Sequence, residues 1–370
     1  MIYFDNAATT PLLPEVKEAM KEAMELFGNP TSIHGAGRKS RVFIEDLRAL
    51  AARLLNVNTG EVFFTSGGTE SLQTSLTGAV RDLGVRRIIT SPLEHHAVLH
   101  NIEALGAIYG VHLVHVDFDH QGRINLDHLE ELLQGSENTM VVLMHANNET
   151  GMLLPLKRTA TLCRSYGALF LADTVQTIGK YRIDLSEGVS FAAASAHKFH
   201  GPKGTGLLFV SGDNVIKPLI LGGGQERNMR SGTENIIGIA GMVKALEIAH
   251  RDAEAVQIGI GKLRNRMISG IRELVPEALI LTDPEHSLHT ILNVGFPVER
   301  MGEMLVYRFD MAGIAVSGGS ACASGVNNPS HVLLALGASP EREHVRFSFS
   351  RINTEEEVEH CLDIMAGMLS

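Results

Sequence analysis

The feature that most constrains the fold is a series of short apolar runs between residues 61 and 210, each followed by a segment of helical periodicity. Runs of this length are typical of strands buried on both faces, and their alternation with helices predicts a mostly parallel sheet covered by helices on either side. We therefore expect an α/β fold. The predicted strands are residues 61–65, 87–90, 139–144, 168–172, 189–192 and 206–210.

The pattern changes after about residue 235. A long helical stretch follows over residues 235–274, then shorter strand-like and helical segments, and a last helix that opens at Thr354 with the spacing of a capping box. A chain of 370 residues also favours two compact domains over one. We expect a large α/β domain over residues 14–250 and a smaller α+β domain formed by residues 1–13 and 251–370.

Composition excludes several classes of function. The net charge of −10 argues against a nucleic-acid-binding surface, and no apolar run approaches the roughly 20 residues of a membrane span. The N-terminal residues lack the basic and apolar regions of a secretory signal. Three cysteines cannot all pair within one chain, so a reducing compartment is expected, and we predict a cytoplasmic protein.

Polar residues follow several of the predicted strands, at the edge where open parallel sheets bind ligands. Residues 66–70 form a glycine-containing turn into a helix, whose free amides suit a phosphate, although an ordinary strand-to-helix turn has the same pattern. Asp173 could pair with a protonated ring nitrogen or simply cap a helix. Lys198 could form a Schiff base, whereas an isolated lysine is usually a solvated surface residue.

Histidines follow the second predicted strand. His95 could stack on an aromatic cofactor and move protons, or it could cap the next helix. His96 and His100 have the i, i+4 spacing of a metal pair. They lack the intervening glutamate of a zinc protease and any matched cysteine cluster, so we expect no metal site.

Two further candidates lie near the C-terminus. Cys322 is surrounded by glycine, alanine and serine, a run without a core-forming pattern that indicates an accessible thiol. Cys163 and Cys361 lie in apolar helical contexts and are expected to be buried. Arg346, in a predicted strand, could hold a carboxylate with two parallel hydrogen bonds or form a surface ion pair.

Together these segments resemble the class V aminotransferase family of pyridoxal 5′-phosphate (PLP) enzymes, and within it the NifS/IscS-like cysteine desulfurases. The order and spacing of the motifs make the resemblance specific over nearly the whole chain. It implies the PLP-dependent transferase fold of type I, with a seven-stranded sheet in the large domain. The segments that carry the resemblance are residues 3–11, 28–34, 64–71, 145–151, 196–204, 229–235 and 317–324.

The resemblance implies a role for the residues around the cofactor ring. Lys198 would be the Schiff-base lysine, and Asp173 would pair with the pyridinium nitrogen. His95 would stack on the ring, and Gln176 would hydrogen-bond the ring oxygen. Asn148 would lie near both the ring and the bound amino acid.

The resemblance also implies which residues bind the phosphate and the substrate. Thr233 would reach the phosphate of a partner subunit, which implies a homodimer. Arg346 would hold the carboxylate of L-cysteine, and Cys322 would take its sulfur as a persulfide. The remaining phosphate-binding residues would be Gly68, Thr69, Ser195 and His197.

The implied activity is the conversion of L-cysteine to L-alanine, with the sulfur passed to an acceptor for iron–sulfur cluster assembly or for tRNA or cofactor thiolation. The sequence does not name the acceptor, and the end of the chain at Ser370, soon after the last helix, leaves the docking partner open. A selenocysteine lyase, a class V aminotransferase and a catalytically idle scaffold subunit remain alternatives.

Overall fold

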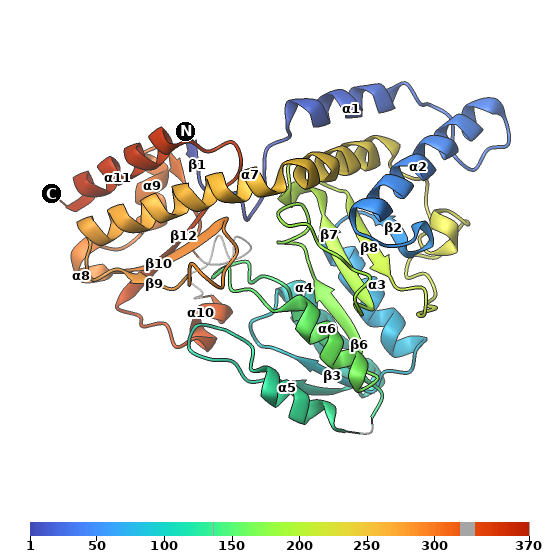
Figure 1. The fold of residues 1–370 in the computed structure, drawn as a ribbon, viewed down its shortest axis with the longest axis horizontal. Helices are drawn as coiled ribbons and strands as arrows, with labels where there is room; N and C mark the ends of the chain where they lie inside the picture. The colour runs from blue at the N-terminus through green and yellow to red at the C-terminus, as the bar shows by residue number, and fades with distance from the viewer. Residues whose placement is uncertain (136, 319–329, 370) are drawn as a thin grey trace.

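The computed structural model describes residues 1–135, 137–318 and 330–369, and its centre is a seven-stranded sheet (Figure 1). The strand order is β2-β8-β7-β6-β5-β3-β4, and β8 runs antiparallel to both of its neighbours. The predicted fold class, a mostly parallel seven-stranded sheet, is confirmed. The strands are β2 (Val62–Thr65), β3 (Arg87–Thr90), β4 (His112–His115), β5 (Thr139–Met144), β6 (Leu169–Asp173), β7 (Phe191–Ser195) and β8 (Gly206–Val210).

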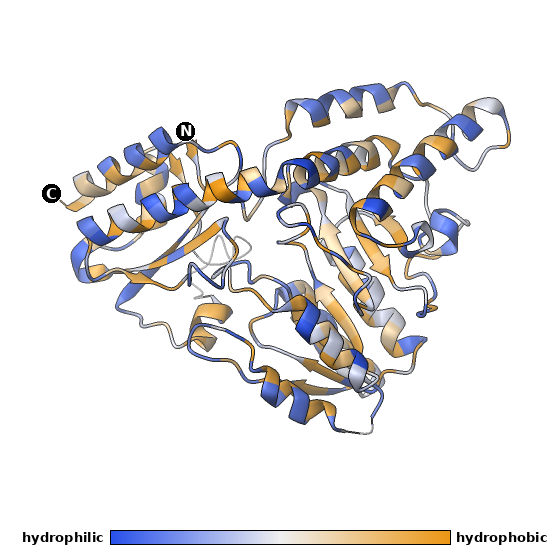
Figure 2. Cartoon of the chain, viewed as in Figure 1, coloured by the Kyte–Doolittle hydropathy of each residue, from blue (hydrophilic) through white to orange (hydrophobic). Residues whose placement is uncertain are grey.

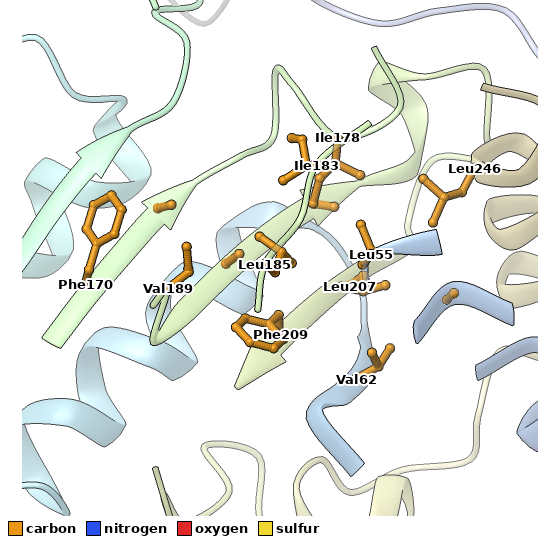
Figure 3. Close-up of a cluster of buried hydrophobic side chains, with 14 of the residues drawn as sticks. Leu55, Val62, Phe170, Ile178, Ile183, Leu185, Val189, Leu207, Phe209 and Leu246 are labelled. Atoms are coloured by element: carbon orange, nitrogen blue, oxygen red, sulfur yellow. The ribbon is translucent and has the colours of Figure 1, made fainter. Parts of the chain in front are cut away.

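Helices cover both faces of this sheet, and the alternation of side chains along β5 shows why. Met140 and Val142 pack on one face with α3 and α4, whereas Val141 and Leu143 pack on the other. Figure 3 shows part of this second cluster, in which Phe170 and Phe209 lie among smaller apolar side chains. The helices of this region are α1 (Pro14–Met24), α2 (Gly35–Leu54), α3 (Gly68–Arg81), α4 (His96–Tyr109), α5 (Leu126–Leu133) and α6 (Leu156–Ser165).

A second core lies around a three-stranded antiparallel sheet of order β12-β10-β9. The N-terminal strand β1 joins this region, because Ile2 and Tyr3 pair in parallel with Ile314 and Ala315 of β11. The elements here are β1 (Ile2–Tyr3), β9 (Leu279–Ile280), β10 (Ile291–Pro297), α8 (Val298–Met301), α9 (Leu305–Met311), β11 (Ile314–Ala315), α10 (His331–Ala335), β12 (Arg342–Ser348) and α11 (Glu355–Leu369).

Helix α7 (Ile236–Leu274) connects the two cores (Figure 1). Its first half contributes Met242 and Leu246 to the core of the large sheet, and its second half contributes Met267 and Ile271 to the second core. Figure 2 shows the corresponding mixture of apolar and polar residues along the helix. The predicted domain boundary at residue 250 falls inside α7, and the division into two domains stays a prediction.

The structure corrects two details of the predicted elements. Among the helical segments expected after residue 274, the one predicted over residues 302–309 begins only at Leu305, because Gly302 and Met304 before it have φ values of +76° and +60°. Strand β4, which was not among the predicted apolar runs, forms one edge of the large sheet. No helix within the described residues is both long and apolar enough to cross a bilayer.

Candidate functional site

A cavity of about 260 Å³ lies beside the carboxyl ends of β5, β6 and β7. The backbone of Ala7 and Ala8, far away in the sequence, closes part of its wall. The structure therefore brings most of the predicted site residues to one place, while their chemical roles stay predictions. Those that line the cavity are Gly68, Thr69, His95, Asn148, Asp173, Gln176, Ser195, His197, Lys198 and Arg346.

Two predicted residues are not part of this wall. Thr233 lines a separate small pocket of about 70 Å³, which residues 64–66 also border. Cys322 lies outside the described residues. The other two cysteines, Cys163 and Cys361, are buried free thiols, and burial raises the pKa of each to about 12. Neither is therefore a thiolate at neutral pH.

Lys198 reaches the cavity from a short turn, Ala196–Lys198, that directly follows β7. Its Nζ donates hydrogen bonds of 2.8 Å to the carbonyl oxygens of Ala7 and Ala8. The N-terminal segment thus holds the ammonium group at the cavity wall, where the lysine is within reach of a bound molecule rather than in bulk solvent.

Asp173 is the last residue of β6 and is almost completely buried. Its Oδ1 accepts a hydrogen bond of 3.0 Å from the backbone N–H of Val175. Burial raises its pKa to about 6, and the Val175 hydrogen bond and the charge of Lys198 oppose this rise. A carboxylate in this position gains most from a cationic N–H partner inside the cavity.

His95 combines the two readings that the sequence left open. It caps α4, because its Nδ1 accepts a hydrogen bond of 3.0 Å from the N–H of Ala97, and it also lines the cavity. Burial, with the charge of Lys198, lowers its pKa to about 4, so the ring is neutral at physiological pH. Since Nδ1 is an acceptor, the proton of the neutral ring is on Nε2.

The first turn of α3 forms the end of the cavity suited to an anion. Gly68 must be glycine here, since a Cβ would lie 2.5 Å from Cγ2 of Val175. The N-cap residue Gly67 has no side chain to cap the helix, which leaves the first amides available for a ligand. With the Ser195 hydroxyl and the His197 ring nearby, these donors fit a phosphate.

Arg346, on β12, also lines the cavity and is 1% exposed. Its Nη1 donates to the carbonyl of Asn148 over 2.8 Å, and its Nη2 forms an ion pair of 2.9 Å with Oδ1 of Asp5. Its Nε is buried and has no hydrogen-bond partner within the described residues. A guanidinium with donors to spare, fixed at two points, suits a substrate carboxylate.

Sequence reasoning missed several residues that support this wall. Asp5 also accepts a hydrogen bond of 2.7 Å from the hydroxyl of Ser317, so it joins Arg346 to the segment that leads to Cys322. Glu149 is buried and accepts from the hydroxyl of Ser330, at the far end of that segment. Both acids lie inside the family-like segments, which was the available signal for them.

The histidines near the cavity do not assemble a metal centre. His96 stacks on His100 with ring centroids 4.9 Å apart and also contacts His331. Across residues 1–135, 137–318 and 330–369, no group of three or more histidine, cysteine, aspartate or glutamate side chains is arranged to hold a metal ion.

Comparison with known proteins gives a consistent result. Residues 2–361 match the family model "Aminotransferase class-V". The chain is 38% identical to the "Cysteine desulfurase IscS" of Dictyoglomus turgidum, an alignment that covers 100% of this chain and 94% of the relative. A solved "NifS-like protein" superposes with a TM-score of 0.91 at 38% identity, covering 100% of this chain and 99% of that one. A structure described as "SspA in complex with cysteine" has a TM-score of 0.82 at 30% identity, covering 96% and 100% of the two chains.

Proposed function

Because this chain belongs to the class V aminotransferase family, and within it to the cysteine desulfurases, we propose that it uses PLP to remove sulfur from L-cysteine, releasing L-alanine. The observation that carries the proposal is the convergence of Lys198, Asp173 and His95 on one cavity with an anion-binding helix end. Each of these groups matches a different part of PLP, so the fit does not depend on any single residue.

The residues present fit PLP at three points. The amides at the start of α3, with Ser195 and His197, would hold its phosphate. Asp173 would pair with the ring nitrogen, and Lys198 would carry the covalent attachment. When bound, the cofactor supplies an electron sink for bonds at the α-carbon of an amino acid.

The side chains of the chain position the substrate and move its protons. Arg346 would bind the carboxylate of L-cysteine through its uncommitted N–H groups. Lys198 Nζ would remove the proton from the α-carbon. Since Nδ1 of His95 remains committed to Ala97, its Nε2–H would donate a hydrogen bond to the substrate sulfur.

Sulfur transfer would then occur at Cys322. Its thiolate attacks the substrate sulfur, and the bond between that sulfur and the β-carbon breaks. The electron pair of the broken bond stays with the β-carbon, which gains a proton to become the methyl group of alanine. Cys322 retains the sulfur as a persulfide, and no external oxidant or reductant is consumed. An acceptor protein for iron–sulfur cluster assembly or thiolation would remove it.

The proposal includes a homodimer in the cytoplasm. Thr233 does not line the cavity of its own subunit, which supports a role at the phosphate of a partner subunit. The large apolar side chains of Phe27, Ile33 and Leu221 are 80% or more exposed, as expected for a surface that another subunit covers. Free Cys163 and Cys361 suit a reducing compartment.

Two substitutions test the chemistry separately. The purified protein should be yellow, and Lys198→Ala should abolish the covalent cofactor adduct. Cys322→Ser should keep the colour but release no sulfide or alanine from L-cysteine. A colourless wild-type protein that does not bind added PLP would refute the cofactor, whereas normal turnover by Cys322→Ser would refute only the sulfur-transfer step.

The same assay separates the alternative enzymes. Alanine release from selenocysteine but not from cysteine would identify a selenocysteine lyase, and amino-group transfer to a keto acid would identify an aminotransferase. If the protein binds the cofactor but turns over none of these substrates, the catalytically idle scaffold subunit is the alternative that remains.

A further inference from the structure

Lys180 lies next to the cavity but has none of the roles proposed above. It is four residues after Gln176, is partly buried, and lines a pocket of about 40 Å³ that Lys198 also borders. Its Nζ donates a hydrogen bond of 2.8 Å to Oε1 of Gln176. The question is what a second lysine does so close to the first.

The surroundings of Lys180 disfavour its charge. Burial, followed by the positive charges of Lys198 and Arg346, lowers its pKa to about 7 from an ordinary 10.5. A cation held beside two others reduces stability, and positions of this kind are concentrated in functional sites. The position therefore calls for an explanation other than stability.

The hydrogen bonds of Gln176 explain why a lysine lies at this position. The Nζ of Lys180 donates to the amide oxygen of Gln176, which it can do as an ammonium group and equally as a neutral amine. A carbonyl can only accept, so the Nε2 that lies 3.0 Å from the oxygen of Ala7 must be the donor. The two contacts require the same orientation of the amide, and Lys198 donates to that same Ala7 oxygen.

We propose that Lys180 is a positioning residue that fixes the Gln176 amide with its N–H donor toward the cavity. One N–H of Nε2 is used by Ala7, and the second is available to an oxygen atom of a bound cofactor. Without Lys180 only the Ala7 contact holds the amide, so the Nε2 donor is oriented less firmly toward the cavity. This inference rests on the proposed PLP chemistry and adds a residue outside the cavity wall to it.

Titration of the cofactor-free protein with PLP tests the proposal. Lys180→Met should weaken PLP binding by roughly 10- to 100-fold, the scale of one hydrogen bond to a charged group. Lys262→Met, at an exposed position of α7, is the matched control and should bind like the wild type. Equal affinity of Lys180→Met and wild type would overturn the proposal.

A double-mutant cycle shows whether Lys180 acts through Gln176. In a Gln176→Ala background, Lys180→Met should have little further effect on PLP affinity, because the amide that it orients is gone. The same loss in both backgrounds would contradict the proposed route. The cycle uses affinity rather than turnover, so it does not depend on the later sulfur-transfer step.

Thermal unfolding separates positioning from a structural role. Removing a disfavoured charge should leave the melting temperature of cofactor-free Lys180→Met unchanged or higher. A lower melting temperature, with affinity lost in both backgrounds, would mean that Lys180 supports the fold instead. If the wild type itself binds no PLP, the proposed function fails. If the wild type binds PLP and Lys180→Met binds it with equal affinity, only the inference about Lys180 fails.

Discussion

At the scale of single residues, burial shifts the pKa values of the cavity side chains in opposite directions. It lowers the pKa of His95 and of His197 to about 4, so both rings are neutral at physiological pH. It raises the pKa of Asp173 to about 6, so this carboxylate is charged there only at a cost in free energy. The buried carboxylate of Asp173 would therefore be stabilised by a cationic group bound in the cavity.

The cost at Asp173 predicts a pH dependence of stability. Its folded pKa of about 6 exceeds the ordinary 3.8, so its contribution to stability is present at low pH and is lost as the pH rises through 6. Cofactor-free Asp173→Asn should therefore match the wild type near pH 4 and exceed it near pH 8, by on the order of 3 kcal/mol at most. Denaturant unfolding at the two pH values measures this.

The variant should at the same time bind PLP more weakly, because an amide cannot supply the negative charge that a protonated ring nitrogen needs. Equal stability of wild type and Asp173→Asn near pH 8 would show that the carboxylate is not strained in the empty cavity. Stability gained with binding lost is the pattern expected of a residue kept for function.

At the scale of elements, a buried ion pair secures the short turn Glu226–Asn228, whose three residues all have positive φ. Arg48 of α2 donates two hydrogen bonds, of 2.8 and 3.0 Å, to the Glu226 carboxylate. Glu226 also accepts from the N–H of Phe64 on β2. Left-handed backbone is costly for Glu226 and Arg227, so the turn depends on such contacts.

Removing one partner of this pair should be strongly destabilising. Arg48→Met leaves Glu226 buried without a counter-charge, and we expect a loss of about 3–5 kcal/mol in the free energy of unfolding. Urea denaturation measures the loss. Lys21→Met, which breaks an exposed pair with Glu18, is the control and should change stability by less than about 1 kcal/mol.

Replacing the unpaired Glu226 carboxylate by a neutral amide should recover part of the stability lost in Arg48→Met. In Arg48→Met with Glu226→Gln, the amide oxygen can still accept from Phe64 without a buried charge. If this double variant is no more stable than Arg48→Met alone, the buried charge is not the source of the destabilisation.

Local sequence determined some elements completely and others not at all. Strands β3, β5 and β8 have the predicted bounds, because their apolar runs are buried on both faces. Strand β4 escaped prediction because its two apolar residues lie between His112 and His115, which are exposed at the edge of the sheet. Its pairing with β3, rather than its own pattern, defines it.

The same distinction applies to the site. Residues that directly follow strands, such as Asp173 and Lys198, could be chosen from the sequence because strand ends converge in open sheets. Asp5 could not, because its importance comes from a contact with Arg346 that only the folded chain creates. An ion pair formed across 341 positions leaves no local pattern.

At the scale of the whole molecule, the proposed dimer gives a prediction about size. Phe27 and Ile33 lie in the connection between α1 and α2, at the end of the molecule where α2 is drawn in Figure 1. The wild type should have twice the 40.1 kDa mass of one chain by light scattering. The double variant Phe27→Asp, Ile33→Asp should have the mass of one chain, because charges are poorly tolerated in an interface core.

Met311→Asp, an equally exposed substitution on α9, is the control and should remain dimeric. The monomeric variant should also lose PLP more readily, since Thr233 of a partner subunit would no longer reach the phosphate. A wild-type mass of one chain would contradict the dimer, and a dimeric double variant would show that the interface lies elsewhere.

The contacts of the first ten residues also set the order in which the cavity is completed during synthesis. Ala7 and Ala8 leave the ribosome long before residues 315–348, yet the segment that carries them is fixed by Ala315, Arg346 and Ser348. Proteins are made from the N-terminus, so these anchors emerge only when most of the chain exists. A nascent chain therefore has the strands of its large sheet before the residues that fix the N-terminal wall of the cavity have been made.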